Sequence, residues 1–514
     1  MIDFSTEDLA QLRARGISVA EAERQLALLR HPPHPARVLR PCCVGDGIRR
    51  IDETEIAELI HRAESVAREG RVSKLVPASG AASRMFQALA ADLDASPDAD
   101  DVEPSAETAR LLAELHRLPF AEALAAALAA EGHDLADLRQ AGRSREILRS
   151  LLHSSGLGFA EMPKGLIPFH RAEAAGRTPF EEHLREAAAL IRDAAGVCRL
   201  HFTVAPEHEP RFRALLDELA PRLAAQLGAR FEVGFSIQHP RTDTLALDLS
   251  TGEPFRTEDG ALLFRPGGHG ALIENLAELA SQGADLVLIK NVDNVLPGGG
   301  PPEVLTWKRV LLGLAAGLSE RAGDLRRALE RPAPEEDQLR AAERFLTDEF
   351  GRSPFPSSTA GPATNEERRQ ALIAALDRPL RVCGVVENTG EPGGGPFWVA
   401  GEEGATTPQL VEASQLDPER RADLLAAATH FNPVDLVCAL RIGGRRLDPL
   451  LFVDPSAVFV TEKSHGGRPL LGLERPGLWN GAMAGWNTVF VEVPNSTFAP
   501  VKTVLDLLRP EHQG

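Results

Sequence analysis

Residues 75–86 read LVPASGAASRMF, an apolar lead that enters a turn of small residues and leaves through Arg84 on a helical pattern. Small side chains let backbone N–H groups approach phosphate oxygens closely, and a helix offers its partly positive N-terminus to the same anion. The stretch therefore predicts a strand, a phosphate-binding turn and a helix in succession. Buried strands also turn into helices through small residues for packing reasons, so both interpretations stay open on these residues alone.

The sequence on both sides of this stretch alternates between strand and helix patterns. The predicted strands are 74–78, 198–204, 231–238, 244–249, 285–292, 380–386, 397–400, 450–460 and 488–493. Helical patterns, such as 180–195 and 209–227, separate most of them. Strands that alternate with helices imply right-handed crossovers and a sheet covered on both faces. We therefore predict an α/β fold whose mostly parallel central sheet is sandwiched by helices.

Three regions follow from this pattern. Residues 1–70 are predicted as an N-terminal helical region, 71–460 as the α/β catalytic domain, and 461–514 as a segment that completes the site. Alanine- and leucine-rich or charged sequence predicts helical insertions at about 103–152 and about 323–377.

Composition excludes several classes of function. The chain has 514 residues, and its 56 Lys+Arg against 74 Asp+Glu give a net charge of -18, which disfavours nucleic acid as a partner. No apolar stretch reaches membrane-spanning length and the N-terminal residues are polar, so we expect a cytoplasmic protein with no membrane association. Five cysteines without a C-x-x-C pair make structural zinc and a disulfide framework unexpected.

Two further stretches offer groups that could hold a nucleotide. MPKGLIPFH, residues 162–170, fixes Lys164 between proline and glycine, where it could present its charge to a phosphate or simply be a solvated loop lysine. FRPGGHGALIENLAELA, residues 264–280, has Gly267, Gly268 and Gly270 as a flat backbone surface for a planar base, with His269 as a contact. Glycine on both sides of the histidine makes packing a poor explanation of that turn.

The last two stretches supply a carboxylate and a lysine. DLVLIKNVDNVLP, residues 285–297, places Asn291, Asp293 and Asn294 at the carboxyl end of a buried strand, where open α/β sheets bind ligands. Asp293 suits a hard cation such as magnesium, or else closes a turn. Lys502 opens an apolar helical pattern near the C-terminus. A lysine is unfavourable at a helix N-terminus unless an anion lies close by, so its place favours a function.

In this order the five stretches resemble the motifs of nucleotidyltransferases that make nucleotide-sugars, in particular the UDP-glucose and UDP-N-acetylhexosamine pyrophosphorylases. The counterparts are 79–84, 163–164, 266–270, 291–294 and 500–503. PASGAASRMF, MPKGLIPFH, THFNPVDLVC and PGLWNGAMAGWNTVFVEVP are also similar to a bacterial family described only as a domain of unknown function. The resemblance implies a nucleotide-diphospho-sugar transferase-like, Rossmann-like fold.

The resemblance also implies a role for each residue. Arg84, Lys164 and Lys502 would be catalytic, acting at the β- and γ-phosphates, the α-phosphate and the attacking phosphate, and Asp293 would carry Mg2+. The nucleotide would be bound by Ala78, Ser79, Gly80, Ala81, Ala82, Ser83, Gln238, Gly267, Gly268, His269, Gly270 and Asn291. The sugar would be bound by Asn294, Glu387 and Asn388, with Thr389 and Glu391 nearby, and Glu387 and Asp454 are candidates for a second metal carboxylate.

The predicted function is therefore the transfer of a nucleotide from a nucleoside triphosphate, UTP first among them, to a sugar-1-phosphate with release of pyrophosphate. Two alternatives stay open. A glycosyltransferase can share this nucleotide-binding fold. A nucleotide-binding protein without turnover would account for the turn ASGAAS, which has fewer glycines than the family's glycine-rich turn normally carries. The base, the sugar and the oligomeric state cannot be predicted from the sequence.

Overall fold

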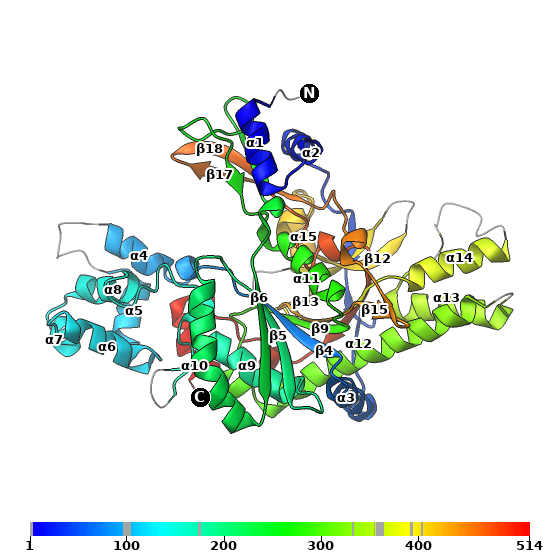
Figure 1. Cartoon of the computed structure of the whole chain (residues 1–514), viewed down its shortest axis with the longest axis horizontal. Helices are drawn as coiled ribbons and strands as arrows, with labels where there is room; N and C mark the ends of the chain where they lie inside the picture. The colour runs from blue at the N-terminus through cyan, green and yellow to red at the C-terminus, as the bar shows by residue number, and fades with distance from the viewer. Residues whose placement is uncertain are drawn as a thin grey trace. The chain divides into compact units, whose positions relative to one another are not determined.

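The computed structural model of the chain describes residues 4–95, 104–172, 176–331, 334–353, 355, 364–390, 394–401 and 405–513. Its ribbon is shown in Figure 1. Two compact units share the chain, and each is built from three separate stretches. Unit 1 consists of Met1–Ala63, Gln238–Ile289 and Val310–Asn495, and unit 2 of Glu64–Ile237, Lys290–Arg309 and Ser496–Gly514. This division by compactness does not bear on the predicted regions 1–70, 71–460 and 461–514, which stay predictions.

Unit 2 contains three parallel strands and their connecting helices. Strand β4 (Val72–Pro77) pairs with β5 (Val197–Thr203), which pairs with β6 (Arg230–Ser236). Helix α10 (Glu209–Leu227) connects β5 to β6 and packs on β6, and α9 (Pro179–Leu190) packs on β5 (Figure 1). Thr178 caps the start of α9 before a proline at its first position, the usual signature of a helix N-terminus. The predicted strands at 74–78, 198–204 and 231–238 and both predicted helices are confirmed.

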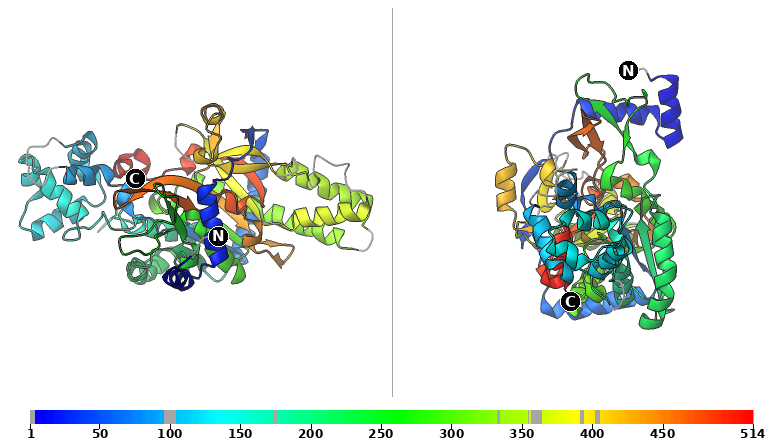
Figure 2. Two further views of the ribbon diagram at one scale, coloured as in Figure 1. Left: turned by 90° about the horizontal axis from the view of Figure 1, so that it is seen from above. Right: turned by 90° about the vertical axis from the view of Figure 1, so that its left-hand side faces the viewer.

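Short helices make up a second part of unit 2. They are α4 (Gln87–Asp94), α5 (Ala106–Glu114), α6 (Ala121–Ala130), α7 (Leu135–Gln140) and α8 (Ser144–Leu152). Their leucines and phenylalanines form one hydrophobic cluster with residues from the turn after β4 and from the C-terminal segment. The cyan helices at the left of Figure 2 are this group; the expected helices are present from 106 to 152, and their being an insertion stays a prediction.

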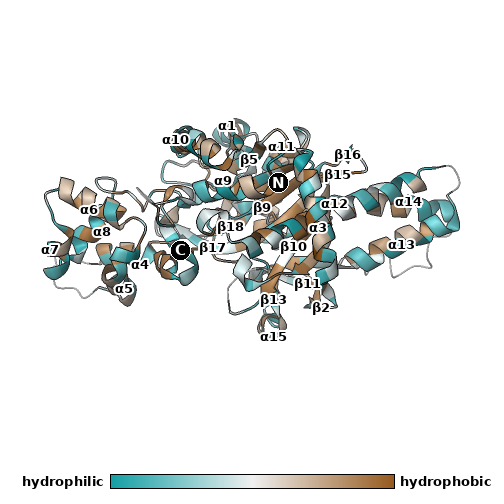
Figure 3. Ribbon diagram, turned by 90° about the horizontal axis from the view of Figure 1, so that it is seen from below, coloured by the Kyte–Doolittle hydropathy of each residue, from teal (hydrophilic) through white to brown (hydrophobic). Residues whose placement is uncertain are grey.

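Unit 1 contains most strands of a second, larger set. In order they are β2 (Cys43–Val44), β3 (Gly47–Arg49), β19 (Asn487–Glu492), β10 (Leu380–Glu387), β14 (Asp435–Ala439) and β9 (Leu286–Lys290). The pairs β2 with β3, β3 with β19 and β19 with β10 are parallel, whereas β14 and the short β13 (His430–Phe431) are antiparallel to β10. Strands β9 and β10 are almost wholly buried and appear brown in Figure 3. The predicted α/β class with a mostly parallel sheet is confirmed.

Smaller antiparallel sheets account for the remaining strands of unit 1. One has the order β17 (Phe459–His465), β18 (Arg468–Glu474), β7 (Thr244–Asp248) and β8 (Phe264–Arg265). The others comprise β1 (Val38–Pro41), β11 (Gly395–Ala400) and β12 (Thr406–Val411), and the pair β15 (Arg441–Ile442) and β16 (Arg445–Arg446). The strand expected at 244–249 therefore exists, but its expected place in the parallel sheet is wrong. It pairs antiparallel with β8, close by in the sequence, and with β18 from a distant part of it, and periodicity does not reveal such pairing.

Helices complete unit 1. The first two, α1 (Thr6–Arg15) and α2 (Val19–Arg30), bury their apolar faces against β7 and β18. The others are α3 (Glu53–Arg68), α11 (Leu272–Ser281), α12 (Pro302–Leu329), α13 (Glu336–Phe350), α14 (Asn365–Leu376) and α15 (Arg421–Ala427), of which α3 and α12 also reach into unit 2. Helices α13 and α14 lie side by side in Figure 2, joined by ion pairs from Arg368 to Glu336 and Glu343. Helices were expected within 323–377 and are present there, while their being an insertion stays a prediction.

One local strand prediction is wrong. Residues 450–460 were expected as a strand, but Pro449–Phe452 is a 3-10 helix and the strand begins only at Phe459. Asp448 caps that 3-10 helix and Pro449 occupies its first position, and both residues favour a turn over a strand.

Across the described residues, no helix is both long and apolar enough to cross a membrane.

Candidate functional site

The turn after β4 is open to solvent where a phosphate would approach. Ala78 is buried and its N–H donates to the Thr203 carbonyl at 2.8 Å, whereas Gly80, Ser83 and Arg84 are exposed. A Cβ built on Gly80 would meet no atom within 4 Å. The helical pattern differs from expectation: Ala82–Arg84 is a 3-10 turn, and α4 begins only at Gln87. Arg84 therefore ends a tight turn and does not lie on the helix.

The segment with Lys164 lies beside this turn. The Ala82 N–H donates to the Met162 carbonyl at 3.1 Å, and the Lys164 N–H donates to the Gly80 carbonyl at 3.4 Å. Lys164 itself begins a 3-10 helix, Lys164–Leu166. A Cβ on Gly165 would lie 2.9 Å from the Phe212 ring, so this close packing requires glycine and fixes the backbone next to the lysine.

The Lys164 ammonium joins two further predicted segments. Its Nζ lies 2.8 Å from Asp293 Oδ2 and 2.8 Å from the Val501 carbonyl oxygen. The two charged side chains are sheltered, with exposed fractions of 14% for Lys164 and 22% for Asp293. A cation, a carboxylate and the residue before Lys502 thus meet at one point, although they are far apart in the sequence.

Backbone contacts hold the Asp293 turn against the C-terminal segment. The Val501 N–H donates to the Asp293 carbonyl at 3.2 Å, and the Ala499 N–H donates to Asn294 Oδ1 at 3.1 Å. Asn294 also forms an isolated β-bridge with Pro500 and is only 2% exposed. This asparagine orders the loop through its side chain, and its predicted role at the sugar stays a prediction.

Lys502 begins a short turn and not the expected helical run. Val504–Leu508 is a 3-10 helix, and the Asp506 carboxylate accepts the N–H groups of Lys502 and Thr503, each at 2.7 Å. The Lys502 Nζ lies 6.0 Å from the centre of the Phe498 ring, within cation–π range. Asp506 therefore fixes the backbone from which the Lys502 side chain extends.

Unit 2 brings together most of the predicted site. It contains Ala78, Ser79, Gly80, Ala81, Ala82, Ser83, Arg84, Lys164, Asn291, Asp293, Asn294 and Lys502. One hydrophobic cluster lies under these segments and includes Ala82, Ile167, Val295, Val501 and Val504. The packing of four distant segments on one core is the physical reason that their polar residues converge.

A buried charge cluster in unit 2 was not predicted. The Glu186 carboxylate contacts Lys74 Nζ at 2.6 Å and Lys290 Nζ at 2.7 Å, and all three residues are at most 3% exposed. Burial acts to raise the pKa of Glu186, but the charges of Lys290, Lys74 and Lys308 outweigh it and hold that pKa well below its ordinary value. Lysine inside the apolar runs VSKLVP and LVLIK is the sequence signal that could have identified this cluster.

His183 connects this cluster to the Asp293 turn. Its Nε2 lies 3.2 Å from the Val292 carbonyl, one residue before Asp293, so Nε2 carries the ring proton and donates it. Burial, reinforced by the Lys74 charge, keeps the pKa of His183 well below its ordinary value. A neutral imidazole thus holds the turn in place.

A second buried network lies in the same unit. Glu182 Oε1 contacts His170 Nδ1 and Arg177 Nε, each at 2.9 Å, and His170 Nε2 lies 2.9 Å from His512 Nδ1. Burial, together with the His170 charge, lowers the pKa of His512 to about 4. The network joins the segment after Lys164 to the C-terminal segment and thereby reinforces the same convergence.

The glycine turn 267–270 belongs to unit 1. A Cβ on Gly270 would lie 2.2 Å from the Pro476 carbonyl oxygen, and one on Gly267 would lie 2.4 Å from the Thr242 carbonyl oxygen. Packing therefore does explain these two glycines, and the expectation that it would not is wrong. Their contact with a nucleoside stays a prediction.

Both ring nitrogens of His269 are engaged within unit 1. Nδ1 accepts the Leu478 N–H at 3.1 Å, so Nε2 carries the proton and lies 3.4 Å from Glu412. The ring stacks on Trp479 with centroids 4.2 Å apart. Contact between His269 and a base through a ring nitrogen would therefore require one of these interactions to break.

Glu387 and Asn388 lie at the end of β10, also in unit 1. Glu387 is exposed and pairs in register with His430, while the Asn388 N–H donates to the Thr429 carbonyl at 2.9 Å. Strand β19 ends beside β10 with Glu492, which is paired with Arg50 at 2.6 Å. This unpredicted carboxylate and guanidinium lie at the carboxyl end of parallel strands, the edge at which such sheets bind ligands.

The Asp454 carboxylate is engaged within its own loop, and its predicted role at a metal stays a prediction. Asp454 Oδ1 accepts the Ser456 N–H at 2.9 Å and the Ser456 hydroxyl at 2.6 Å, which closes a local turn. Glu391 lies outside the described residues. Over the ranges that the structure describes, no group of three or more His, Cys, Asp or Glu side chains could hold a metal ion.

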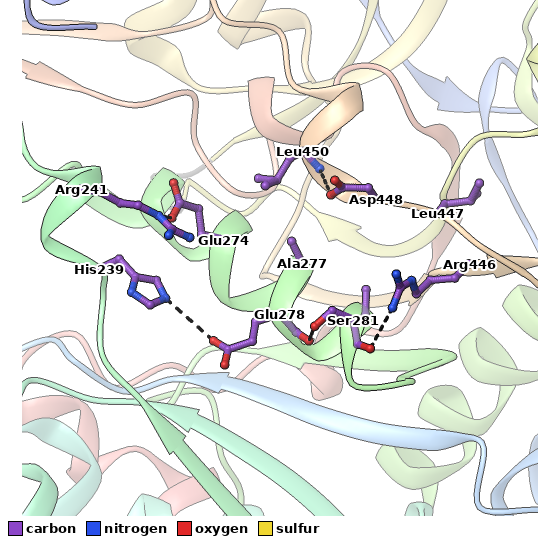
Figure 4. Close-up of a pocket in the computed structure, with 11 residues that line it drawn as sticks. His239, Arg241, Glu274, Ala277, Glu278, Ser281, Arg446, Leu447, Asp448 and Leu450 are labelled. Carbon is purple, nitrogen blue, oxygen red and sulfur yellow. Dashed lines mark hydrogen bonds and ion pairs between the residues drawn. The ribbon is translucent and has the colours of Figure 1, made fainter. Parts of the chain in front are cut away.

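Gln238 adjoins a pocket of unit 1 with a volume of about 410 Å³. Figure 4 shows its lining, in which Arg241 faces Glu274 at 2.5 Å and His239 faces Glu278 at 3.8 Å. Arg446 of the same lining donates to the Ser281 carbonyl, and Asp448 accepts the Leu450 N–H. Gln238 itself does not line it, and its predicted contact with a nucleoside stays a prediction.

Comparison with solved structures finds UDP-sugar pyrophosphorylases. The UDP-glucose pyrophosphorylase from Leishmania major is 14% identical with a TM-score of 0.44, and the match covers 98% of this chain and 79% of that chain. The uridine diphosphate N-acetylglucosamine pyrophosphorylase from Trypanosoma brucei, in complex with inhibitor, is 12% identical with a TM-score of 0.48 and the same coverage. The UDP-glucose phosphorylase from Trypanosoma brucei is 13% identical with a TM-score of 0.44, covering 98% and 77%.

Comparison with sequences gives a family. No curated protein matches the chain. One family model matches residues 5–513, almost the whole length, which confirms the membership expected from the four sequence stretches quoted above. The chain belongs to the family described as Domain of unknown function (DUF4301).

Proposed function

We propose that the chain is a nucleotidyltransferase acting on a nucleoside triphosphate and a sugar-1-phosphate. An oxygen of the sugar phosphate attacks the α-phosphorus, the bond from that phosphorus to the bridging oxygen of the β-phosphate breaks, and pyrophosphate leaves. The observation that carries the proposal is the position of Lys164, whose ammonium lies 2.8 Å from both Asp293 and the Val501 carbonyl, beside the open turn at Gly80. The order of sequence motifs supports the same reaction.

This reaction requires alignment and cationic charge more than covalent chemistry from the protein. Two polyanions must meet, and negative charge accumulates on the phosphoryl group being transferred. In the proposal the turn at Gly80 and the exposed Arg84 receive the β- and γ-phosphates, Lys164 receives the α-phosphate, and Lys502 holds the attacking phosphate. Asp506 and the buried Glu186 cluster would position these groups without touching the substrates.

The residues present fit a bound magnesium ion. Asp293 offers one carboxylate, and Mg2+ usually takes one or two carboxylates and leaves its other positions to water and phosphate oxygens. When bound, the ion would neutralise phosphate charge. A single protein carboxylate also implies that the triphosphate must supply further ligands, so the proposed site is completed by the nucleotide.

The proposal is tested by measuring pyrophosphate release. The four ribonucleoside triphosphates and dTTP are screened against a panel of sugar-1-phosphates with Mg2+, and UTP is expected to give a product with at least one sugar. Nucleotide binding by calorimetry without pyrophosphate release from any pair would instead favour a binding protein. Consumption of a nucleotide-sugar without pyrophosphate would favour a glycosyltransferase.

Lys502→Ala should lower kcat about a hundredfold, the usual cost of removing one electrostatic stabiliser of the transition state. Arg139→Ala is the matched control, because Arg139 is an exposed cation on α7 of the same unit. Turnover at the wild-type rate in the Lys502 variant would remove this residue from the proposed mechanism.

Asp293→Asn should raise the Mg2+ concentration needed for half-maximal rate by more than about tenfold, since even residues behind metal ligands contribute roughly 10–100-fold to affinity. Asp217→Asn on the exposed face of α10 controls for the loss of one surface charge. An unchanged metal titration would exclude Asp293 as the metal ligand.

A further inference from the structure

The Lys164 ammonium and the Asp293 carboxylate form a sheltered ion pair. Asp293 is also the carboxylate that the proposed function assigns to the metal. The Nζ to Oδ2 distance of 2.8 Å is that of a charge-assisted hydrogen bond, and the Val501 carbonyl accepts a second N–H at 2.8 Å. Exposed fractions of 14% and 22% set the pair apart from the surface ion pairs of long, mobile side chains.

The backbone on both sides of the pair is fixed. Lys164 is tied to Gly80, and Gly165 is packed against Phe212, while Asp293 is tied to Val501 through its carbonyl. Neither residue can leave the pair through a backbone shift without disrupting these contacts. Separation of the pair therefore requires a side-chain rotation, and the Lys164 side chain has four rotatable bonds and an open turn beside it.

We propose that Lys164 is a built-in counter-cation, which occupies Asp293 in the free protein and leaves it when a divalent cation arrives with the triphosphate. A divalent ion bound to either Asp293 oxygen would lie a few ångströms from the ammonium, and like charges at that distance disfavour each other. The phosphates of the nucleotide remove the conflict, because they ligate the metal and offer the displaced ammonium a new anion. The metal therefore enters as its nucleotide complex and not ahead of it.

This inference deepens the proposed function and rests on it for the role of the triphosphate, whereas the competition itself is measurable without any substrate. The probe is Mn2+ alone, titrated into the full chain and followed by the electron paramagnetic resonance signal of the free ion. The variants are Lys164→Met, Lys164→Arg, which keeps the charge, and the double variant Lys164→Met/Asp293→Asn. Circular dichroism and thermal unfolding confirm that each variant is folded.

Lys164→Met should bind Mn2+ about tenfold or more tightly than the wild-type chain, since one charge at about 4–6 Å shifts an ionic equilibrium by at least a power of ten. Lys164→Arg should bind as weakly as the wild type, and the gain should disappear in the double variant. Equal Mn2+ affinity in Lys164→Met and wild type would overturn the inference, as would a gain that persists in the double variant. If Lys164→Met is unstable, Lys164→Gln gives the same comparison.

The two proposals fail separately. Pyrophosphate release by the wild type without an Mn2+ gain in Lys164→Met would leave the nucleotidyltransferase function standing and refute the counter-cation. An Mn2+ gain in a chain that releases no pyrophosphate with any substrate pair would support the competition at Asp293 and refute the proposed reaction.

Discussion

Replacing Glu186 by glutamine should destabilise unit 2 severely. The carboxylate of Glu186 is the common partner of Lys74 and Lys290, at 2.6 and 2.7 Å, and these residues are 1% and 2% exposed. Glutamine has almost the same size and shape, so the substitution opens no cavity. The loss is therefore that of the charge, which leaves two buried ammonium groups without their anion.

The magnitude follows from the burial of the cluster. Removing one partner of a buried ion pair costs about 3–5 kcal/mol, because the remaining charge is left uncompensated. Since a single carboxylate serves two lysines here, we expect a loss of stability toward the upper end, about 4–5 kcal/mol. This is a large part of the roughly 5–15 kcal/mol that stabilises a typical domain.

Hydrogen exchange followed by mass spectrometry is the suitable assay. The chain has two compact units, so one unfolding free energy for the whole chain is not well defined, whereas exchange is resolved by segment. Peptides that cover β4 and α9 should exchange roughly a thousandfold faster in the variant, since every 1.4 kcal/mol is about a factor of ten. Glu209→Gln is the control, because its pair with Arg213 on α10 is exposed and is worth less than about 0.5 kcal/mol.

The pH dependence has a defined sign. The folded-state pKa of Glu186 is lowered, so its contribution is present at pH values above its ordinary pKa and is lost as the pH falls through the folded value. In the variant, burial without the Glu186 charge favours the neutral amine, so part of the stability should return at alkaline pH. At neutral pH, hydrogen exchange of β4 in Glu186→Gln that is no faster than in the Glu209→Gln control would refute this reasoning. It would show that Lys74 and Lys290 do not depend on the charge of Glu186.

Two further substitutions test local geometry. Gly270→Ala should destabilise unit 1 by about 1–3 kcal/mol, because its Cβ would lie 2.2 Å from the Pro476 carbonyl oxygen. Gly80→Ala should leave stability nearly unchanged, because no atom lies within 4 Å of its Cβ. Thermal unfolding distinguishes the two variants, and equal unfolding midpoints would contradict the packing argument. Asp506→Ala should lower the stability of the turn by about 1 kcal/mol and speed hydrogen exchange of the Lys502 amide, one of the two amides that donate to Asp506 at 2.7 Å. Unchanged hydrogen exchange at Lys502 would show that the carboxylate does not order this turn.

Much of the fold was predictable because burial leaves a periodic signal. Strands such as β9 and β10 are largely apolar and buried. Helix α10 begins next to Pro210, at Glu209, and ends before Gly228, as these two residues predict. The pairing of strands leaves no such signal. Residues 244–249 read as a strand, but the pairing of β7 with β8 and with the distant β18 determines that it belongs to an antiparallel sheet.

The candidate site was predictable to the level of segments. The motif order indicated that five segments belong together, namely 79–84, 163–164, 266–270, 291–294 and 500–503. Unit 2 brings four of them into contact, whereas 266–270 belongs to unit 1 and its part in the site stays a prediction. The direct pairing of Lys164 with Asp293 was not predictable, because it depends on side-chain geometry across 129 positions of sequence. The buried Glu186 cluster was missed for a related reason, since a lysine in an apolar run gives no indication of which helix carries its partner.

The make-up of unit 2 has a consequence for how the protein is synthesised. Its core includes Val501, Val504 and Leu508 together with Met85 and Phe86 from the turn after β4. A growing chain that has left the ribosome with the early residues cannot close this core until the late ones have also emerged. The part of the early apolar surface that these late residues cover thus remains exposed until they emerge, a condition that favours aggregation and makes chaperone assistance valuable.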